Sequence, residues 1–571
     1  MSKRKFKAKK SAVQGKTQVN MQNSGYDGGG ASRTSGILKA WNPTKSSAKS
    51  DINAHLDILR SRAADQAINT PVGSAAIATT TQYTVGAGLK VFPKVKYQLL
   101  DMTPEEAESW NKQAAMEFNL WASSKLCDIR KRNNFYDLQE ILYKAYMTDG
   151  DSFAIFRRAY DINMPYTLRI QAIEGNRVSN PQGRDFYGIT GPLAVEMTAP
   201  NGHNKIINGV EVDGNGAVEA YWISNKVPFD PVEINSTTTW ARVEAFGDIM
   251  SQPNVLHICH DERPEQYRGV PYLAPVIKAL KQVSRYSDAE LAAAILRSYF
   301  TIFFISTGNS SFAGDVSSIL GASTYDKDGG TGPVVDANEY SLGPGTINAL
   351  PKNIDVKSIG ATGGQATFDG FMTVYIKMIA AALNIPYEVL MKSFNSSYSA
   401  SRAALLQAWE QFRLRRAWFS RDFCQPVYEM WLTEAVATGR IEAPGFFSDP
   451  AIRFAYCNAE WYGPSMSILD PVKDINGSTL RIQCGLSTHE REAAEMTGSD
   501  FYENLETIRI EQQRAEEAGV ALGTLPATNE PQSPAEGGDS DGRDEEDNDT
   551  ERPEAGTEAL GGGKAEAAAG G

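Results

Sequence analysis

The sequence has few of the residues that mark secreted, disulfide-stabilised or membrane-spanning proteins. Its five cysteines stand far apart in 571 residues and form no C-x-x-C pair, so we expect reduced structural thiols. The best candidate for a membrane span, Leu291–Ile305, is interrupted by Arg297 and Ser298, whereas a span needs roughly 20 apolar residues. No apolar core follows the charges near the N-terminus, so we expect no secretory signal and no membrane partner.

Catalytic and metal-binding motifs are also scarce. Residues 15–17 (Gly-Lys-Thr) resemble the end of a phosphate loop, but Lys10 stands where that loop needs glycine. His257, Cys259 and His260 have metal-ligand chemistry, yet strand alternation places His260 on the opposite face from the other two. We expect a structural role for them, with zinc as the alternative. No G-x-S-x-G string or evident triad is present, so we predict no enzyme activity, no cofactor and no metal.

The charge is unevenly distributed along the chain. The formal net charge is −13, of which residues 525–571 carry −10 and residues 1–10 carry +6, so residues 11–524 carry −9. A mildly acidic body argues against a protein that grips nucleic acid tightly, but it is compatible with a channel through which DNA slides. The first 50 residues and residues 524–571 lack apolar periodicity, and we expect both segments to be disordered or only partly ordered.

Between these ends, the patterns predict an α+β fold of several domains. Residues 51–125 are mainly helical in pattern, with a helix start at Thr103 and Pro104. Residues 152–260 have strand character broken by glycine and asparagine.

Helical spacing then returns in three stretches. One long helix covers Leu273–Thr301, and a second covers Phe368–Leu383 and must end before Pro386. Residues 303–362 between them predict a small β-containing insertion. A third helix runs from Ser399 to about Thr438 and should kink just before Pro426, because proline removes a backbone hydrogen bond and clashes with the preceding turn.

Charged and aromatic side chains on the third helix could contact DNA, but packing and pairing are the commoner fates. Arg413, Arg415 and Arg416 could bind phosphate; we favour a solvated face or an ion pair between subunits. The aromatic residues at helical spacing are expected in the core rather than stacked on bases: Trp409, Phe412, Phe419 and Phe423. Further along, Ser487 and Glu490 fit a capping box.

Several strings, in this order and spacing, resemble the lambda family of phage portal proteins. They are Tyr26-Asp27-Gly28-Gly29-Gly30, Trp41-Asn42-Pro43, Ala382-Leu383-Asn384-Ile385-Pro386-Tyr387-Glu388-Val389-Leu390, Tyr398-Ser399-Ala400-Ser401-Arg402 and Cys484-Gly485-Leu486-Ser487-Thr488-His489-Glu490. The resemblance runs from about Tyr26 to about Gly519. It implies a portal fold with an α/β wing, long stem helices, a small β-containing clip and a helical crown, in a dodecameric ring around a channel.

Carried onto this chain, the resemblance implies the following divisions. They are an N-terminal arm (1–50), a wing (51–272), a first stem helix (273–302), a clip (303–365), a second stem helix (366–391), a tunnel loop (392–398), a kinked helix and wing return (399–470), a crown (471–523) and an acidic tail (524–571). The tunnel loop supplies the candidate DNA-channel residues: Lys392, Phe394, Asn395, Ser396, Ser397 and Tyr398. We expect Ser399 or Ser401 to cap the helix that follows it.

The implied function is a non-enzymatic ring at one capsid vertex of the virion, assembled in the host cytoplasm. Genome packaging by the terminase, DNA ejection and head–tail joining would take place there. The implied partners are other copies of the chain, double-stranded DNA bound without sequence preference, the terminase, the major capsid protein or scaffold, and head-completion or tail connector proteins. Two alternatives remain open: another virion ring protein, such as a connector or baseplate component, and a DNA-processing enzyme.

Overall fold

The protein is described from a computed structural model. The described residues are 40–181, 195–228, 230, 237–247, 251–298, 302–305, 347–350, 366–394, 397–466 and 471–520. Of the predicted arm, only residues 40–50 are described, and the predicted tail lies outside the described residues. The chain divides into two compact units, Met1–Phe501 and Tyr502–Gly571.

The first part of the larger unit is mainly helical, as predicted for residues 51–125. Its elements are η2 (Lys49–Asn53), α1 (Leu56–Asn69), α2 (Pro71–Thr84), β1 (Lys90–Pro93), η3 (Tyr97–Leu99), α3 (Pro104–Ala122), η4 (Lys125–Cys127) and α4 (Phe135–Asp149). The predicted helix start is confirmed as a capping box. Thr103 Oγ1 accepts a hydrogen bond from Glu106 N (3.2 Å), and the Glu106 carboxylate accepts one from Thr103 N (2.8 Å).

Two antiparallel sheets follow, which confirms the strand prediction for residues 152–260. In the first, β2 (Asp151–Arg158) lies between β3 (Leu168–Glu174) and β9 (Val255–Cys259), with α4 packed against it. The 3-10 turn η5 (Gly175–Arg177) leads on from β3. The second sheet is a five-stranded meander of β4 (Glu196–Thr198), β5 (Lys205–Ile207), β6 (Val210–Val212), β7 (Val218–Ser224) and β8 (Trp240–Glu244).

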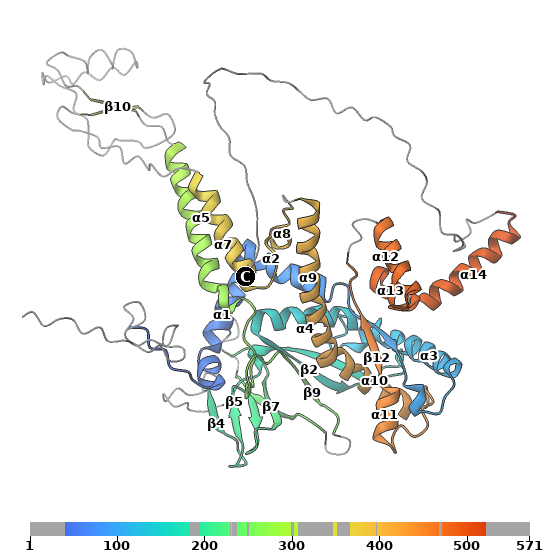
Figure 1. Cartoon of the computed structure of the whole chain (residues 1–571). Coiled ribbons are helices and arrows are strands. Elements are labelled where there is room, and N and C mark those ends of the chain that lie inside the picture. The colour runs from blue at the N-terminus through green and yellow to red at the C-terminus, as the bar shows by residue number, and fades with distance from the viewer. Residues whose placement is uncertain are drawn as a thin grey trace, which may run out of the picture. The chain divides into compact units, whose positions relative to one another are not determined.

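A pair of long helices comes next. After η6 (Ala274–Val276), α5 (Ile277–Ser298) runs beside α7 (Ala366–Ala382), in agreement with two of the predicted helices (Figure 1). Between them in sequence, β10 (Ile302–Ile305) pairs in parallel with β11 (Ile347–Leu350). The rest of the predicted insertion lies outside the described residues.

The chain then returns to the sheets through a helix with an interruption. α8 (Tyr387–Met391) follows α7 after a break that includes Pro386, so residues 366–391 hold two helices. α9 (Tyr398–Phe419) passes through the π-helical turn η7 (Ser420–Cys424) into α10 (Gln425–Ala437). A π-helical turn therefore stands just before Pro426, at the place where the sequence predicts a kink.

The last elements include a strand that pairs with the start of the chain. After α11 (Pro450–Tyr456), β12 (Ala459–Tyr462) pairs antiparallel with β1. α12 (Pro471–Gln483), α13 (His489–Thr497) and α14 (Phe501–Glu517) are the helices predicted for residues 471–523. The predicted cap at Ser487 is wrong by one residue. Thr488 has the extended backbone of an N-cap, and its side chain accepts a hydrogen bond from Arg491 N (3.2 Å).

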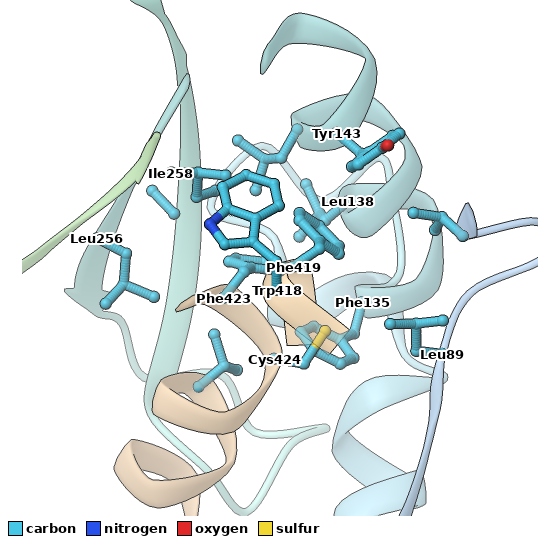
Figure 2. Close-up of a cluster of buried hydrophobic side chains, with 14 of the residues drawn as sticks. Leu89, Phe135, Leu138, Tyr143, Leu256, Ile258, Trp418, Phe419, Phe423 and Cys424 are labelled. Carbon is cyan, nitrogen blue, oxygen red and sulfur yellow. The ribbon is translucent and has the colours of Figure 1, made fainter. Parts of the chain in front are cut away.

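The main core of the larger unit joins α4, the three-stranded sheet and the segment from α9 to α10. Figure 2 shows Trp418, Phe419, Phe423 and Cys424 packed among Phe135, Leu138, Tyr143, Leu256 and Ile258. The aromatic spacing on the third predicted helix thus places Phe419 and Phe423 in the core, as expected. Among the described residues, no helix is long and apolar enough to cross a membrane.

Candidate functional site

The segment Lys392–Tyr398 connects α8 to α9 at a fixed point on the larger unit. Lys392 caps α8 with a left-handed backbone (φ 53°), and Ser393 N donates a hydrogen bond to Glu388 O (3.1 Å). Phe394 is 47% exposed, and Lys392 is exposed as well. Asn395 and Ser396 lie outside the described residues. The described part of the segment therefore presents a cation and an aromatic ring to solvent, which suits non-covalent contacts rather than catalysis.

The helix after this segment begins earlier than the sequence predicts. Ser397 is the N-cap of α9, and its backbone oxygen accepts the hydrogen bond of Ser401 N (2.9 Å), so the predicted caps at Ser399 and Ser401 are wrong. The Ser397 and Ser399 hydroxyls instead lie 3.2 Å apart, within hydrogen-bonding distance. Tyr398 is consequently the first residue of the helix and not part of the loop.

The base of the segment is buried and bonded. The turn between α7 and α8 is closed by Ile385 N, which donates to Ala380 O (3.0 Å), and Asn384 takes a left-handed backbone (φ 54°). Tyr272 donates its hydroxyl hydrogen to Leu383 O, which ties this turn to the chain just before α5. Four apolar side chains of the turn and of α8 are buried: Leu383, Ile385, Val389 and Leu390. A rigid base of this kind positions the exposed residues after it.

The paired helices α5 and α7 have one buried face and one apolar face that the chain leaves exposed. Tyr286 of α5 packs on Phe371 of α7, with ring centroids 4.5 Å apart. Leu280 and Val283 on α5 and Ile376 and Ile379 on α7 are buried near the base. In contrast, Leu291 is 63%, Val374 57% and Met378 59% exposed. Apolar side chains repeated along a helix pair at this exposure mark a surface suited to another protein.

The arginines of α9 are engaged within the chain. Arg413 pairs with Glu495 within the chain (3.3 Å), and its side chain is 52% exposed, which agrees with the solvated face that was one of the two expectations. Arg415 lies over the Tyr272 ring, 4.7 Å from its centroid. Arg416 donates to the backbone oxygens of Thr84, Tyr83 and Pro464 at 2.8–3.1 Å. Phe412 is buried and Trp409 is half-buried, so this helix is built for packing.

The residues with metal-ligand chemistry point to different partners. His257 stacks on Phe153 (4.3 Å between centroids) and lies 3.5 Å from an Asp151 oxygen, whereas His260 packs edge-on against Trp418. The Cys259 thiol contacts Asp261. Within the described residues, no group of three or more potential ligands could hold a metal ion.

Sequence reasoning missed a buried charged cluster beside this histidine. Asp151 is fully buried and accepts hydrogen bonds from Arg60 (2.6 Å) and Arg268 (2.7 Å). Arg268 also donates to the backbone oxygens of Gly175 and Val178, both at 2.7 Å. The partners come from α1, β2, η5 and the loop after β9. Because Asp151 and its partners are far apart in sequence, no local motif predicts this cluster.

Burial and charge shift the pKa values of this cluster in opposite directions. Burial alone raises the pKa of Asp151, but Arg268 and Arg60 outweigh it and hold that pKa well below its ordinary value. Burial raises the pKa of Asp149 to about 6, with Arg60 acting against it. Burial and the neighbouring Arg268 lower the pKa of Arg60 to about 10. The arrangement is that of a structural ion-pair network.

Comparison with known proteins identifies the family. A family model described as "Phage portal protein, lambda family" matches residues 34–416. The portal protein of Escherichia phage N15 is 26% identical over 514 residues, covering 86% of this chain and 90% of the relative. Portal protein B of Escherichia phage lambda is 24% identical over 495 residues, covering 84% and 87%.

Solved structures give a weaker likeness. A chain from the neck of a native GTA particle, computed with C12 symmetry, is 12% identical with a TM-score of 0.35, covering 75% of this chain and 91% of its own. A chain from the virion of a native gene transfer agent (GTA) particle is 12% identical with a TM-score of 0.37, covering 77% and 92%. The match of the family model over most of the chain decides the assignment: this chain belongs to the lambda family of phage portal proteins.

Proposed function

We propose that this chain carries out the portal function of its family as one subunit of a closed ring at a capsid vertex, a non-enzymatic channel for packaging and ejecting double-stranded DNA. The observation that carries the ring is the exposed apolar face of α5 and α7, represented by Leu291, Val374 and Met378. A neighbouring subunit covers such a face when copies are related by rotation around an axis. A dodecamer is the stoichiometry we expect from the family.

The assignment of regions follows from the same proposal. The two sheets with α1–α4 and α9–α10 form the wing, α5 and α7 the stem, β10 and β11 part of the clip, and α12 and α13 part of the crown. The clip would meet the terminase during packaging and the head-completion or tail connector proteins afterwards. The wing would meet the major capsid protein or scaffold.

In this arrangement the segment between α8 and α9, Lys392–Ser397, faces the DNA as the tunnel loop. Lys392 supplies one positive charge per subunit, which the ring repeats around the axis and which salt screens. Phe394 supplies an apolar contact, and the serines and Asn395 suit a wet lumen. Weak contacts of this kind hold phosphate without sequence preference and do not oppose translocation.

The test uses particles assembled with variants of Lys392 and Phe394. Lys392→Glu combined with Phe394→Ala should leave the native mass of the ring unchanged and reduce retention of packaged DNA, whereas Lys392→Arg should behave like the parent. Equal genome retention in the Lys392→Glu/Phe394→Ala variant and the parent would refute the tunnel-loop role. A monomer at micromolar concentration, without rings by electron microscopy, would refute the ring itself.

A further inference from the structure

The side of β3 that faces away from β2 is a sheet edge, and described residues cover it only in part. Leu168 O accepts a hydrogen bond from Trp121 Nε1 (3.0 Å) and Ile170 O accepts one from Ile129 N (3.0 Å), so these carbonyls point away from β2. By the two-residue period of a strand, the backbone groups of Ala172 point the same way. No described residue forms a hydrogen bond with that outward side of Ala172.

A cavity begins where the chain leaves this edge. The segment up to Ile129 runs along β3, with Asp128 forming a parallel bridge to Ile170, and the chain then turns away. Beside Ala172 lies a cavity of about 330 Å³. It is lined by the apolar side chains of Leu138 and Ile141 on α4 and by the polar residues Asp128, Arg130, Arg132 and Asn133 of the segment before α4. The cavity therefore occupies the place that a further strand residue would take.

The charges around this cavity are unbalanced. The Asp128 carboxylate is already engaged: it accepts hydrogen bonds from the backbone N–H groups of Arg130 (3.0 Å), Arg132 (3.2 Å) and Asn133 (3.3 Å). Lys131 between the two arginines pairs with Asp161 (2.7 Å). The Arg130 and Arg132 side chains are exposed, and neither has an ion-pair or hydrogen-bond partner among the described residues. Two guanidinium groups thus remain available to an anionic ligand.

We propose that this edge binds an extended acidic peptide segment of a partner protein, which adds to β3 as a strand. The backbone of the peptide would pair with the outward groups of Ala172, as in strand addition to other exposed sheet edges. Its carboxylates would pair with Arg130 and Arg132, because guanidinium groups bind carboxylates in a bidentate geometry. An aliphatic side chain between two acids would contact Leu138 and Ile141. The proposal does not depend on ring assembly.

The test is a fluorescence anisotropy titration of the full chain with a labelled peptide, acetyl-Gly-Glu-Val-Glu-Val-Glu-Gly amide. Removal of both charges in Arg130→Ala/Arg132→Ala should weaken binding at least about tenfold, as expected for two charge-assisted contacts. Ala172→Pro should weaken it about tenfold as well, because proline removes the outward N–H while an edge strand tolerates it. The control Lys125→Ala/Lys131→Ala removes the same charge from η4 and the loop that follows it and should change binding less than about threefold.

Hydrogen exchange separates strand addition from simple attraction between charges. Bound peptide should slow hydrogen exchange of the Ala172 amide in the parent. A peptide with lysine in place of glutamate should neither bind nor slow this exchange. If Ala172→Pro binds like the parent, the peptide does not add as a strand and the proposal fails. Absence of binding to the parent at millimolar peptide, or equal loss in the control variant, also overturns it. Unchanged native mass and thermal unfolding confirm that each variant is folded.

Discussion

The two regions around β2 and along α5–α7 bury their side chains to very different extents. Around β2, even charged groups are buried and bonded: Asp151 is fully buried between Arg60 and Arg268. Along α5 and α7, apolar side chains such as Val374 and Met378 remain more than half exposed. The charged groups around β2 find their partners within a single chain. The helices α5 and α7 leave an exposed apolar surface that a neighbouring chain would cover.

In the proposed ring, this difference separates the residues that stabilise the single chain from the residues that would join neighbouring copies. A buried charge that loses its partner is costly to the folded chain, whereas an exposed apolar side chain that becomes charged costs the single chain little. Variants in the two regions should therefore fail in different assays.

The largest effect is expected for Arg268→Ala in the buried cluster. Loss of this guanidinium leaves Asp151 with Arg60 as its remaining arginine and removes the Arg268 donor from Val178 O, whereas Gly175 O keeps Arg60 Nη1 (3.4 Å) as a donor. We expect a loss of about 3–5 kcal/mol in the free energy of unfolding, measured by urea denaturation. Arg157→Ala, on the exposed end of β2, is the control and should cost less than about 0.5 kcal/mol. Similar values for both variants would mean that the cluster contributes no more than the surface does.

The second effect concerns assembly. Val374→Asp combined with Met378→Asp places two charges on the exposed face of α7 and should abolish rings in native mass spectra. We expect each substituted side chain at the interface to weaken the free energy of association by about 2 kcal/mol or more. Unfolding of the single chain should be nearly unchanged. Met116→Asp, at a position on α3 that is 75% exposed, is the control. Intact rings in the double variant would show that this face is not between subunits.

The third prediction concerns pH. Because burial raises the folded-state pKa of Asp149 to about 6, the folded chain binds this proton more tightly than the unfolded chain does. The contribution of this residue to stability therefore falls as pH rises from about 4 to about 6. Asp149→Asn removes that loss and should stabilise the protein by about 1–3 kcal/mol at pH 8 and much less at pH 4. Equal effects at both pH values would exclude the shifted carboxyl as the cause.

The smallest effects should appear at helix caps. Thr103 makes both bonds of its capping box, so Thr103→Ala should lower the free energy of unfolding by about 1 kcal/mol. Ser397 makes no cap bond with its side chain, and Ser397→Ala should lower it by less than about 0.5 kcal/mol. Thermal unfolding of the two variants in parallel gives the comparison. A larger loss for Ser397→Ala than for Thr103→Ala would mean that the start of α9 contributes more to stability than the start of α3.

Local signals explain which parts of the fold could be predicted from sequence. The start at Thr103 depends on residues within one turn and is confirmed, and a π-helical turn lies where Pro426 predicts a kink. The N-caps at Ser397 and Thr488 were not predicted, because a serine close by in the sequence is chemically just as able to cap the helix. The partners of Asp151 lie 91 and 117 residues away along the chain, so no periodicity could reveal them. The DNA-facing role of Lys392–Tyr398 remains a prediction.

The pairing of β1 with β12 has a consequence for the order of folding. Lys90 lies opposite Tyr462, so this small sheet cannot form until the chain has been synthesised as far as Tyr462. The chain builds α5 and α7 before that point, and contacts between such distant segments form slowly because a long loop must close. In a nascent chain, the apolar face of these two helices is therefore exposed before β1 has paired with β12. Premature association of unfinished chains is a hazard built into this topology, and slow translation or a chaperone that shields α5 and α7 should raise the yield of correctly closed subunits.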